Sequence, residues 1–265
     1  MNDDTLLISV MTVNNEVGTA MPIPEIAKIK DEYNKEHGTR ILLHTDAVQA
    51  VGKVEINLKG NFKGVDFLSA SAHKFHGPKG MGILYVNKDG FGSNVRSFML
   101  GGGQEKGFRS GTENVPGIAG TGLAMEMVTK DLEDRICYFM NLRDRLIDGL
   151  KNNIDKIEIH PSLESEGVSV CPSVLNVSFL GTRGEVILHT LEQDEIYVST
   201  GSACSSNHKS SKGSHVLNAM GLKPDEIEGA IRFSFSEFNT KEDIDKTIDC
   251  VAKAVNRFRK LGSFR

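Results

Sequence analysis

The apolar and polar positions of the chain alternate between strand-like and helix-like periods over its first hundred residues. Short apolar runs at 5–11, 40–45, 65–70 and 82–87 have the length typical of buried strands. The segment 23–37 repeats its apolar side chains with helical spacing and is followed by glycine. Strands that alternate with helices predict an α/β fold with a mainly parallel sheet.

The second half of the chain has a different pattern. A helical period begins near Val115 and continues past Leu150, which predicts one long helix. Strand-like and helix-like segments are mixed beyond it. They predict a smaller α+β domain at 126–265, in addition to a partial large domain at 1–125. Strands are predicted around Ile157 and at 174–180 and 231–236, and helices at 183–191 and from 240 onward.

One lysine directly follows the apolar run at 65–70. The run continues into Ser71-Ala-His73-Lys74 and then into a turn rich in glycine and proline. We expect packing to hold Lys74 at a strand edge and desolvate it, which would lower its pKa and make its amine a nucleophile toward an aldehyde cofactor. The alternative is a solvated loop lysine, the usual state of this residue type.

The preceding apolar run ends in a carboxylate, Asp46, with the amide of Gln49 three residues later. In open α/β sheets, ligands bind outside the carboxyl ends of the strands. An aspartate there can pair with the pyridine nitrogen of pyridoxal phosphate, although capping of a helix is the alternative. Two neighbouring units of a parallel sheet would bring Asp46 and Lys74 to one edge. His44, within the run, is interpreted as structural.

A cysteine in a small and polar segment is the third candidate for chemistry. Cys204 lies in the serine-rich stretch 199–214, which predicts an exposed and mobile thiol. Nearby basic side chains would favour its thiolate form. The alternative is an ordinary free cysteine in a linker. These basic side chains are His208, Lys209 and Lys212.

Two further polar residues are candidates for a binding role. Arg232 is a charge within an otherwise apolar strand, and its burial is costly unless an anion meets it. A substrate carboxylate or a structural ion pair would satisfy the guanidinium. Asn15 offers a neutral amide, and its alternative role is that of a turn-forming residue before Gly18.

Composition and charge exclude several classes of protein. The net charge of −4 over 265 residues, without a long basic run, argues against a nucleic-acid partner. No apolar run reaches the length of a membrane span, and the first residues lack the features of a signal peptide, so a cytoplasmic protein is expected. The four cysteines form no C-x-x-C pair and predict reduced thiols without a metal site. Apart from Cys204 they are interpreted as structural: Cys137, Cys171 and Cys250.

Six motifs follow one another in an order that resembles the cysteine desulfurases of the NifS/IscS type. They are Val13-Asn-Asn-Glu-Val-Gly18, Asp46-Ala-Val-Gln49, Ser71-Ala-His73-Lys74, Arg109-Ser-Gly-Thr112, Ser202-Ala-Cys204-Ser-Ser and Ala230-Ile-Arg232-Phe-Ser. The resemblance places the chain among the class-V aminotransferases, with the fold type I of pyridoxal-phosphate enzymes. It implies removal of sulfur from L-cysteine, which leaves L-alanine and a protein-bound persulfide.

The resemblance also implies a role for each matching residue. Lys74 and Cys204 are the expected catalytic residues, and Asn15 and Arg232 are expected to bind the substrate. Thr112 is expected to reach the phosphate of a neighbouring subunit, which implies a homodimer. No metal is expected beyond transient iron–sulfur ligation by Cys204. The implied residues of the pyridoxal-phosphate site are Asn15, Asp46, Gln49, Ser71, His73, Lys74 and Thr112.

The chain departs from the family at its start. Members begin with a further segment that carries a phosphate-binding turn at a helix N-terminus and a ring that stacks on the cofactor. We therefore expect a fragment, a misplaced start or one half of a split enzyme, and in the last case pairing with a subunit that carries this segment. The implied sulfur acceptor is an iron–sulfur scaffold or another thiol protein, including one that serves tRNA thiolation. The alternatives are a catalytically silent interaction module and a related lyase that acts on selenocysteine.

Overall fold

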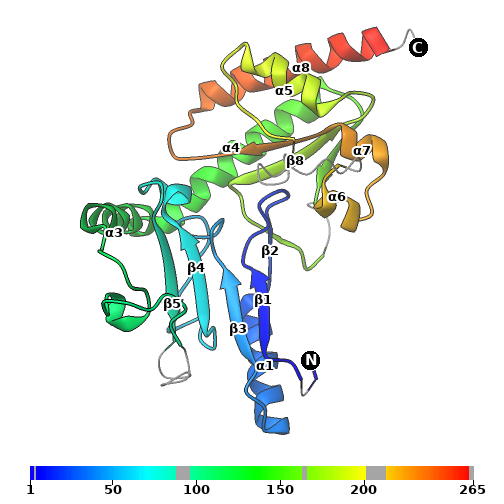
Figure 1. The fold of residues 1–265 in the computed structure, drawn as a ribbon. Helices are drawn as coiled ribbons and strands as arrows, with labels where there is room; N and C mark the ends of the chain where they lie inside the picture. The colour runs from blue at the N-terminus through cyan, green and yellow to red at the C-terminus, as the bar shows by residue number, and fades with distance from the viewer. Residues whose placement is uncertain (3, 88–95, 163–165, 201–212, 263–265) are drawn as a thin grey trace. The chain divides into compact units, whose positions relative to one another are not determined.

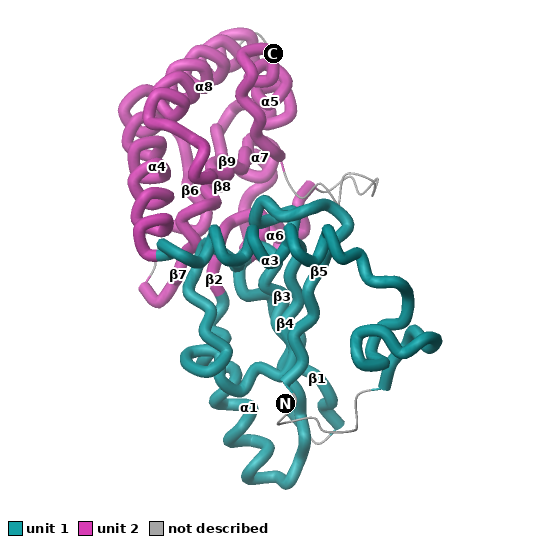
Figure 2. Tube along the Cα trace, turned by 90° about the vertical axis from the view of Figure 1, so that its left-hand side faces the viewer, with its two compact units in different colours: residues 1–13, 21–132 teal, residues 14–20, 133–265 magenta. Residues whose placement is uncertain are grey.

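The structure, a computed structural model, divides the chain into two compact units (Figure 2). Unit 1 consists of Met1–Val13 and Met21–Leu132, and unit 2 of Asn14–Ala20 and Glu133–Arg265. The domain borders predicted from the sequence stay predictions. The residues that the structure describes are 1–2, 4–87, 96–162, 166–200 and 213–262.

Unit 1 is built on a four-stranded sheet in the order β1-β3-β4-β5, whose strands lie side by side in Figure 1. The pairs β1/β3 and β3/β4 are parallel, as the sequence pattern predicts, and the β4/β5 pair is antiparallel. Its elements are β1 (Leu7–Met11), α1 (Ile23–His37), β3 (Leu42–Asp46), β4 (Phe67–Ser71), the 3₁₀ turn η1 (Ala72–Phe75), β5 (Gly82–Val86), the 3₁₀ turn η3 (Glu105–Gly107) and α3 (Val115–Lys130).

Helix α1 is held against the sheet by apolar packing and by one buried ion pair. Its Ile23 and Ala27 are almost fully buried. Lys30 donates from Nζ to Asp66 Oδ2 at 3.0 Å, and that same oxygen accepts a hydrogen bond from the backbone N–H of Leu43 at 2.9 Å. Asp66, the residue directly before β4, therefore connects α1 to β3 through its carboxylate. Strand β4 begins at Phe67, two residues later than the predicted start at 65.

Unit 2 has an antiparallel sheet in the order β6-β8-β9 and a short pair formed by β2 and β7. Every residue of β8 is buried, and the core joins it to α4, α5, β9 and α8 through side chains such as Phe139, Phe179 and Val251. Its elements are β2 (Thr19–Ala20), α4 (Leu132–Asn153), β6 (Ile157–His160), β7 (Ser169–Val170), β8 (Val174–Phe179), α5 (Gly184–Glu192), α6 (His215–Ala219), α7 (Pro224–Glu228), β9 (Ala230–Ser234) and α8 (Lys241–Gly262).

The predicted long helix from 115 to beyond 150 is wrong. It is two helices, α3 and α4, because Asp131 has non-helical backbone angles of φ −122° and ψ 54°. Aspartate is favoured at the start of a helix, so the break falls at a residue suited to it. Elements of two to five residues, such as β2, β7, α6 and α7, were not predicted because they are too short for a periodic pattern. Among the described residues, no helix is long and apolar enough to cross a membrane.

Candidate active site

Two neighbouring parallel strands of unit 1 bring the first predicted site residues to one edge of the sheet. Asp46 is the last residue of β3 and pairs in register with Ser69 of β4. Strand β4 ends two residues later at Ser71, and Lys74 follows within η1. Adjacent strands lie about 4.8 Å apart. The predicted shared edge for Asp46 and Lys74 is therefore confirmed as a matter of topology.

The turn that carries Lys74 is fixed by its neighbours. Phe75 is buried, and His76 closes η1 in the left-handed region at φ 66°, which non-glycine residues rarely adopt. The N–H of Gly77 donates to the carbonyl of Ala72 at 2.8 Å. A Cβ at Gly77 would lie only 2.9 Å from the Ala72 side chain, so the turn requires glycine there.

Lys74 is exposed, which corrects the expectation that packing would desolvate it at a strand edge. It lies in a 3₁₀ turn in which the next residue, Phe75, takes the inward position. The part of the chain that the structure describes therefore does not bury the amine. Desolvation would have to come from a ligand or from another polypeptide.

Asp46 is followed by a turn and not by a helix, so the alternative of helix capping is wrong, and its pairing with a cofactor stays a prediction. Its Oδ1 accepts a hydrogen bond from the N–H of Val48 at 2.8 Å, so one carboxylate oxygen stabilises the turn after β3. The residue as a whole remains exposed, which leaves its carboxylate accessible to a ligand. Gln49, in the same turn, accepts a hydrogen bond from Lys53 Nζ at Oε1 over 3.2 Å.

The remaining predicted residues of unit 1 are exposed or half-buried. Ser71 is half-buried and does not cap η1 with its side chain, and His73 is exposed. Thr112 is exposed in the glycine-rich segment three residues before α3. Helix α3 in turn packs against η1. The structure thus gathers Asp46, Ser71, His73 and Lys74 around one end of the sheet, with Thr112 in a segment that leads into a helix beside η1.

His44 has partners that the sequence did not identify. Its ring lies between two hydroxyls, with Nδ1 2.8 Å from Ser9 Oγ on β1 and Nε2 3.1 Å from Ser69 Oγ on β4. This line of polar contacts joins β1, β3 and β4 one pleat before Asp46. The structural interpretation of His44 is consistent with it. Its partners depend on the register between strands that are distant in the sequence, which the sequence analysis did not predict.

Arg232 and Asn15 lie together in unit 2. The Nη1 of Arg232 donates to the backbone carbonyl of Asn15 at 2.8 Å, while its Nε is buried without a hydrogen-bond partner. Burial lowers the pKa of Arg232, and the negative charge of Glu16 acts in the opposite direction. Across the described residues, Arg232 forms no ion pair within 4.0 Å, so the alternative of a direct structural ion pair is not realised there. An unsatisfied guanidinium N–H is a donor that a carboxylate could take up.

Glu16 was missed by the sequence analysis, although it stands in one of the quoted motifs. It is 1% exposed, and its Oε2 accepts a hydrogen bond from the Ser214 hydroxyl. Asn176, next to Arg232 in the β8/β9 register, donates to the carbonyl of Glu16 at 3.2 Å. The available signal was weak, because Glu16 stands between Asn15 and Val17 and acidic residues in such places are mostly exposed.

The turn before Gly18 is formed by Asn14 and not by Asn15. Asn14 Oδ1 accepts hydrogen bonds from the N–H groups of Glu16 at 2.8 Å and Val17 at 3.1 Å. The turn-forming role offered as the alternative for Asn15 therefore belongs to its neighbour. The backbone then passes through Gly18 at φ 75°, where a Cβ would press against Val174.

Cys204, with His208, Lys209 and Lys212, lies outside the described residues, so its predicted exposure and mobility stay predictions. The described residues on either side of it are anchored to the cluster just described. Ser199 exchanges two backbone hydrogen bonds with Arg232, of 3.1 and 2.6 Å. Ser214 caps α6 through Leu217 N–H at 3.2 Å while it donates to Glu16.

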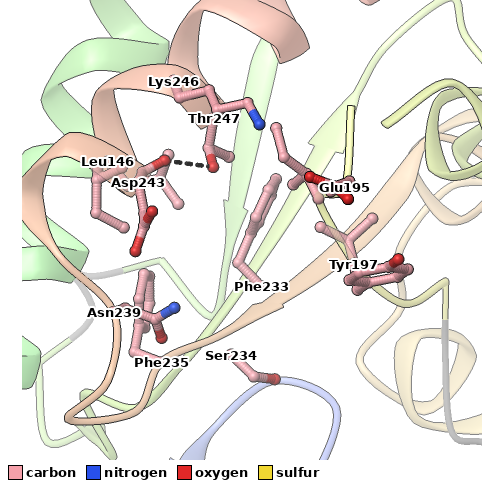
Figure 3. Close-up of a pocket in the computed structure, with 13 residues that line it drawn as sticks. Leu146, Glu195, Tyr197, Phe233, Ser234, Phe235, Asn239, Asp243, Lys246 and Thr247 are labelled. Carbon is pink, nitrogen blue, oxygen red and sulfur yellow. Dashed lines mark hydrogen bonds between the residues drawn. The ribbon is translucent and has the colours of Figure 1, made fainter. Parts of the chain in front are cut away.

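A pocket in unit 2 contains none of the predicted site residues (Figure 3). Glu195, Tyr197 and Lys246 lie around Phe233 there, and Lys246 donates to the carbonyl of Asp194 at 2.7 Å. Successive strand residues point to opposite faces. Phe233 therefore faces away from the side of β9 that carries Arg232, and the pocket is not the predicted carboxylate site.

The residues at the sheet edge of unit 1 fit pyridoxal phosphate by their chemistry. Asp46 can pair with the ring nitrogen, Lys74 offers the primary amine, and the Ser71 hydroxyl and His73 imidazole are suited to a phosphate. Within the ranges that the structure describes, no three histidine, cysteine or acidic side chains are grouped as metal ligands would be.

Comparisons with known proteins show the family of the chain. The family described as aminotransferase class-V matches residues 1–247. The chain is 42% identical over 263 residues to the cysteine desulfurase IscS of Methanosarcina thermophila, a match that covers 98% of this chain and 60% of the relative. A solved NifS-like protein superposes with a TM-score of 0.82 at 39% identity, covering 97% of this chain and 63% of that one. A NifS-like protein from Rickettsia africae gives a TM-score of 0.79 at 31% identity, over 95% and 62% of the two chains.

The chain thus spans about 60% of the length of the curated relatives that it matches, within their C-terminal portion. The predicted α/β fold class is confirmed by the superpositions. Since the family match extends over nearly all of its residues, the chain belongs to the class-V aminotransferase family.

Proposed function

We propose that the chain takes part in cysteine desulfuration with pyridoxal phosphate. In this reaction L-cysteine and the Cys204 thiol give L-alanine and a Cys204 persulfide: the carbon–sulfur bond of the substrate breaks, a sulfur–sulfur bond forms, and the substrate carbon takes up a proton. The observation that carries the proposal is the placement of Asp46 and Lys74 at the ends of two neighbouring parallel strands. The identity of about 40% to cysteine desulfurases supports the choice of substrate.

The residues of unit 1 would act on the cofactor and on protons. When bound, pyridoxal phosphate withdraws electrons from the substrate Cα. Asp46 would keep a proton on the ring nitrogen, with its carboxylate oriented by the N–H of Val48. Lys74 would accept the Cα proton of the substrate and return one to the carbon that loses sulfur. Ser71, His73 and Gln49 would bind the cofactor, and Thr112 would reach the phosphate bound by a second copy in a homodimer.

The residues of unit 2 would orient the substrate. The unsatisfied Nε and the neighbouring N–H groups of Arg232 would grip the substrate carboxylate, with the Asn15 carbonyl fixing the guanidinium at 2.8 Å. Glu16, buried beside it, would hold the guanidinium charged despite its burial. Cys204 would take the sulfur and pass it to a thiol acceptor, such as an iron–sulfur scaffold or a protein of tRNA thiolation.

The proposal is tested by product analysis. Purified protein is incubated with pyridoxal phosphate, a reducing thiol and L-cysteine, alone and together with the N-terminal portion of the Methanosarcina thermophila relative that this chain does not match. We expect alanine and sulfide in equal amounts, and loss of both in Lys74→Ala. In Cys204→Ser, persulfide on the protein is expected to be absent. Alanine formation that persists in Lys74→Ala would contradict the proposal.

A further inference from the structure

Unit 2 holds a pocket that the proposed function does not use (Figure 3). Its volume is about 380 Å³, and it is lined by the first turns of α8, the end of β9, one residue of α4 and the segment 195–198 that follows α5. This volume falls within the range of roughly 300–1,000 Å³ that is typical of small-molecule sites. The pocket is therefore large enough for an organic ligand with the bulk of one aromatic side chain or more.

The floor of the pocket is apolar. Phe233 and Phe235 alternate with Ser234 along the chain and so point to the same side of the sheet. They belong to one apolar cluster with Leu146 of α4 and Ile244 of α8, and each of these four side chains is at most 7% exposed. Such a floor binds the apolar part of a ligand, and aromatic rings in particular pack well against other rings.

The rim of the pocket is polar. Figure 3 shows Asp243 on one side of Phe233, and Glu195 and Tyr197 on the other. Tyr197 is 78% exposed, so the face of its ring is accessible at the rim. The pocket thus combines an apolar floor with carboxylates and an accessible aromatic ring, which are groups that attract a cation.

Glu195 is the rim group that is most available to a ligand. Its side chain is exposed and forms no hydrogen bond and no ion pair with the residues that the structure describes. Its backbone lies in the left-handed region at φ 60°, which non-glycine residues rarely adopt. Backbone conformations of this kind are concentrated at functional sites, including those that bind ligands. Glu195 therefore offers a carboxylate that can pair with an ammonium group.

The charges of the rim favour a cation over an anion. Two carboxylates stand against one ammonium, and this ammonium, of Lys246, already donates to the carbonyl of Asp194 at 2.7 Å. The N-terminus of α8 would by itself favour an anion. Its first turn already carries Glu242 and Asp243, however, and Asp243 Oδ2 accepts a hydrogen bond from the N–H of Thr240 at 2.9 Å. That preference is therefore met within the protein.

We propose that this pocket binds a small organic cation that joins a primary ammonium to an aromatic or similarly bulky apolar group. The apolar group packs on Phe233 and Phe235. The ammonium pairs with Glu195 beside the ring of Tyr197, whose π electrons also attract a cation. The site lies within unit 2 and shares no residue with the proposed active site.

The probe is 2-phenylethylamine, which is positively charged at pH 7. It is compared with neutral 2-phenylethanol and anionic 3-phenylpropanoate, which carry other polar groups on the same phenylethyl body. Binding to the purified protein is followed by saturation-transfer NMR at physiological salt. We expect the amine to bind saturably and about fivefold more tightly than the alcohol, as one exposed ion pair with a cation–π contact would give, and the carboxylate to bind most weakly.

Two variants and one control locate the site. Glu195→Gln is expected to remove the preference for the amine over the alcohol, and Tyr197→Ser to weaken the binding of both. The control is Glu192→Gln, which removes an exposed carboxylate that pairs with His189 at 2.9 Å and does not line the pocket. It is expected to change the affinity for the amine less than twofold.

Three results would overturn the inference. They are the absence of saturable binding of 2-phenylethylamine, equal affinity for the amine and the alcohol, and a preference for the amine that Glu195→Gln leaves unchanged. Tighter binding of 3-phenylpropanoate than of the amine would mean that Lys246 dominates the rim, and it would contradict the cationic class of the ligand.

Discussion

Replacing Asp66 by asparagine is expected to destabilise the part of the sheet that carries the candidate site. Asp66 Oδ2 lies 3.0 Å from Lys30 Nζ and 2.9 Å from Leu43 N, and the two charged side chains are only 4% and 9% exposed. Breaking one partner of a buried ion pair costs about 3–5 kcal/mol. Lys30 keeps the carbonyl of Gly64 at 2.8 Å and the more exposed carboxylate of Asp31 at 2.9 Å, so we expect about 2–4 kcal/mol.

The assay is urea unfolding followed by circular dichroism, with hydrogen exchange of the α1 amides as a local measure of unit 1. A double-mutant cycle with Lys30→Met isolates the pair, and the double variant is expected to be more stable than the sum of the single losses predicts, by about 1–3 kcal/mol. Lys28→Ala on the same helix is the control. Its side chain is 77% exposed and its ammonium lies 4.0 Å from Glu32, so its loss should cost less than about 0.5 kcal/mol.

The reasoning fails if Asp66→Asn is no more destabilising than Lys28→Ala, or if the two losses of the cycle simply add. Either result would mean that the contact between α1 and the sheet is held by apolar packing alone. Loss of Asp66 is also expected to weaken cofactor binding. Its carboxylate accepts a hydrogen bond from β3, which ends at Asp46, and it directly precedes β4, which leads to Lys74.

Three further predictions concern unit 2. Burial lowers the pKa of His160, so the unfolded chain takes up a proton at a higher pH than the folded chain does. The free energy of unfolding should therefore fall as the pH drops below 6.5. Urea titrations at several pH values should show a flatter dependence on pH for His160→Gln. Ser214→Ala should lower the free energy of unfolding by about 2–3 kcal/mol, because it removes both the hydroxyl bonded to buried Glu16 and the cap of α6. A loss below about 0.5 kcal/mol in the same assay would contradict this. In the product assay with the N-terminal portion of the Methanosarcina thermophila relative, Arg232→Lys should raise the KM for L-cysteine about tenfold or more with a smaller change in kcat, since lysine cannot bind a carboxylate with two donors. An unchanged KM would argue against carboxylate binding by Arg232.

Local signals predicted the elements well where one residue decides a boundary. Helix α1 ends at His37 as predicted, because Gly38 adopts the left-handed conformation at φ 64°. The neighbouring parallel strands β3 and β4 were also predicted, although the described residues between them form turns and no helix. The break at Asp131 was missed, because the apolar period continues across it and only the backbone angles reveal the end of α3.

The contacts that shape the candidate site depend on tertiary structure and could not be read from local patterns. Glu16 and Ser214 are bonded although 198 positions separate them. The partners of His44 on two other strands follow from register alone. The exposure of Lys74 depends on the burial of the next residue, Phe75, which decides the direction of the turn. Residue types thus indicated the chemistry, and the fold determined which residues are hydrogen-bonded to each other and which are buried.

The central claim is that Lys74 and Asp46 bind one molecule of pyridoxal phosphate at the carboxyl ends of β3 and β4. The most direct test is borohydride reduction of the protein with pyridoxal phosphate, alone and with the N-terminal portion of the Methanosarcina thermophila relative, followed by peptide mapping by mass spectrometry. The account predicts that the label is concentrated on Lys74, is displaced by L-cysteine added before the reduction, and is strongly reduced in Asp46→Ala. Label spread evenly over the exposed lysines, or label on Lys74 that Asp46→Ala leaves unchanged, would contradict it.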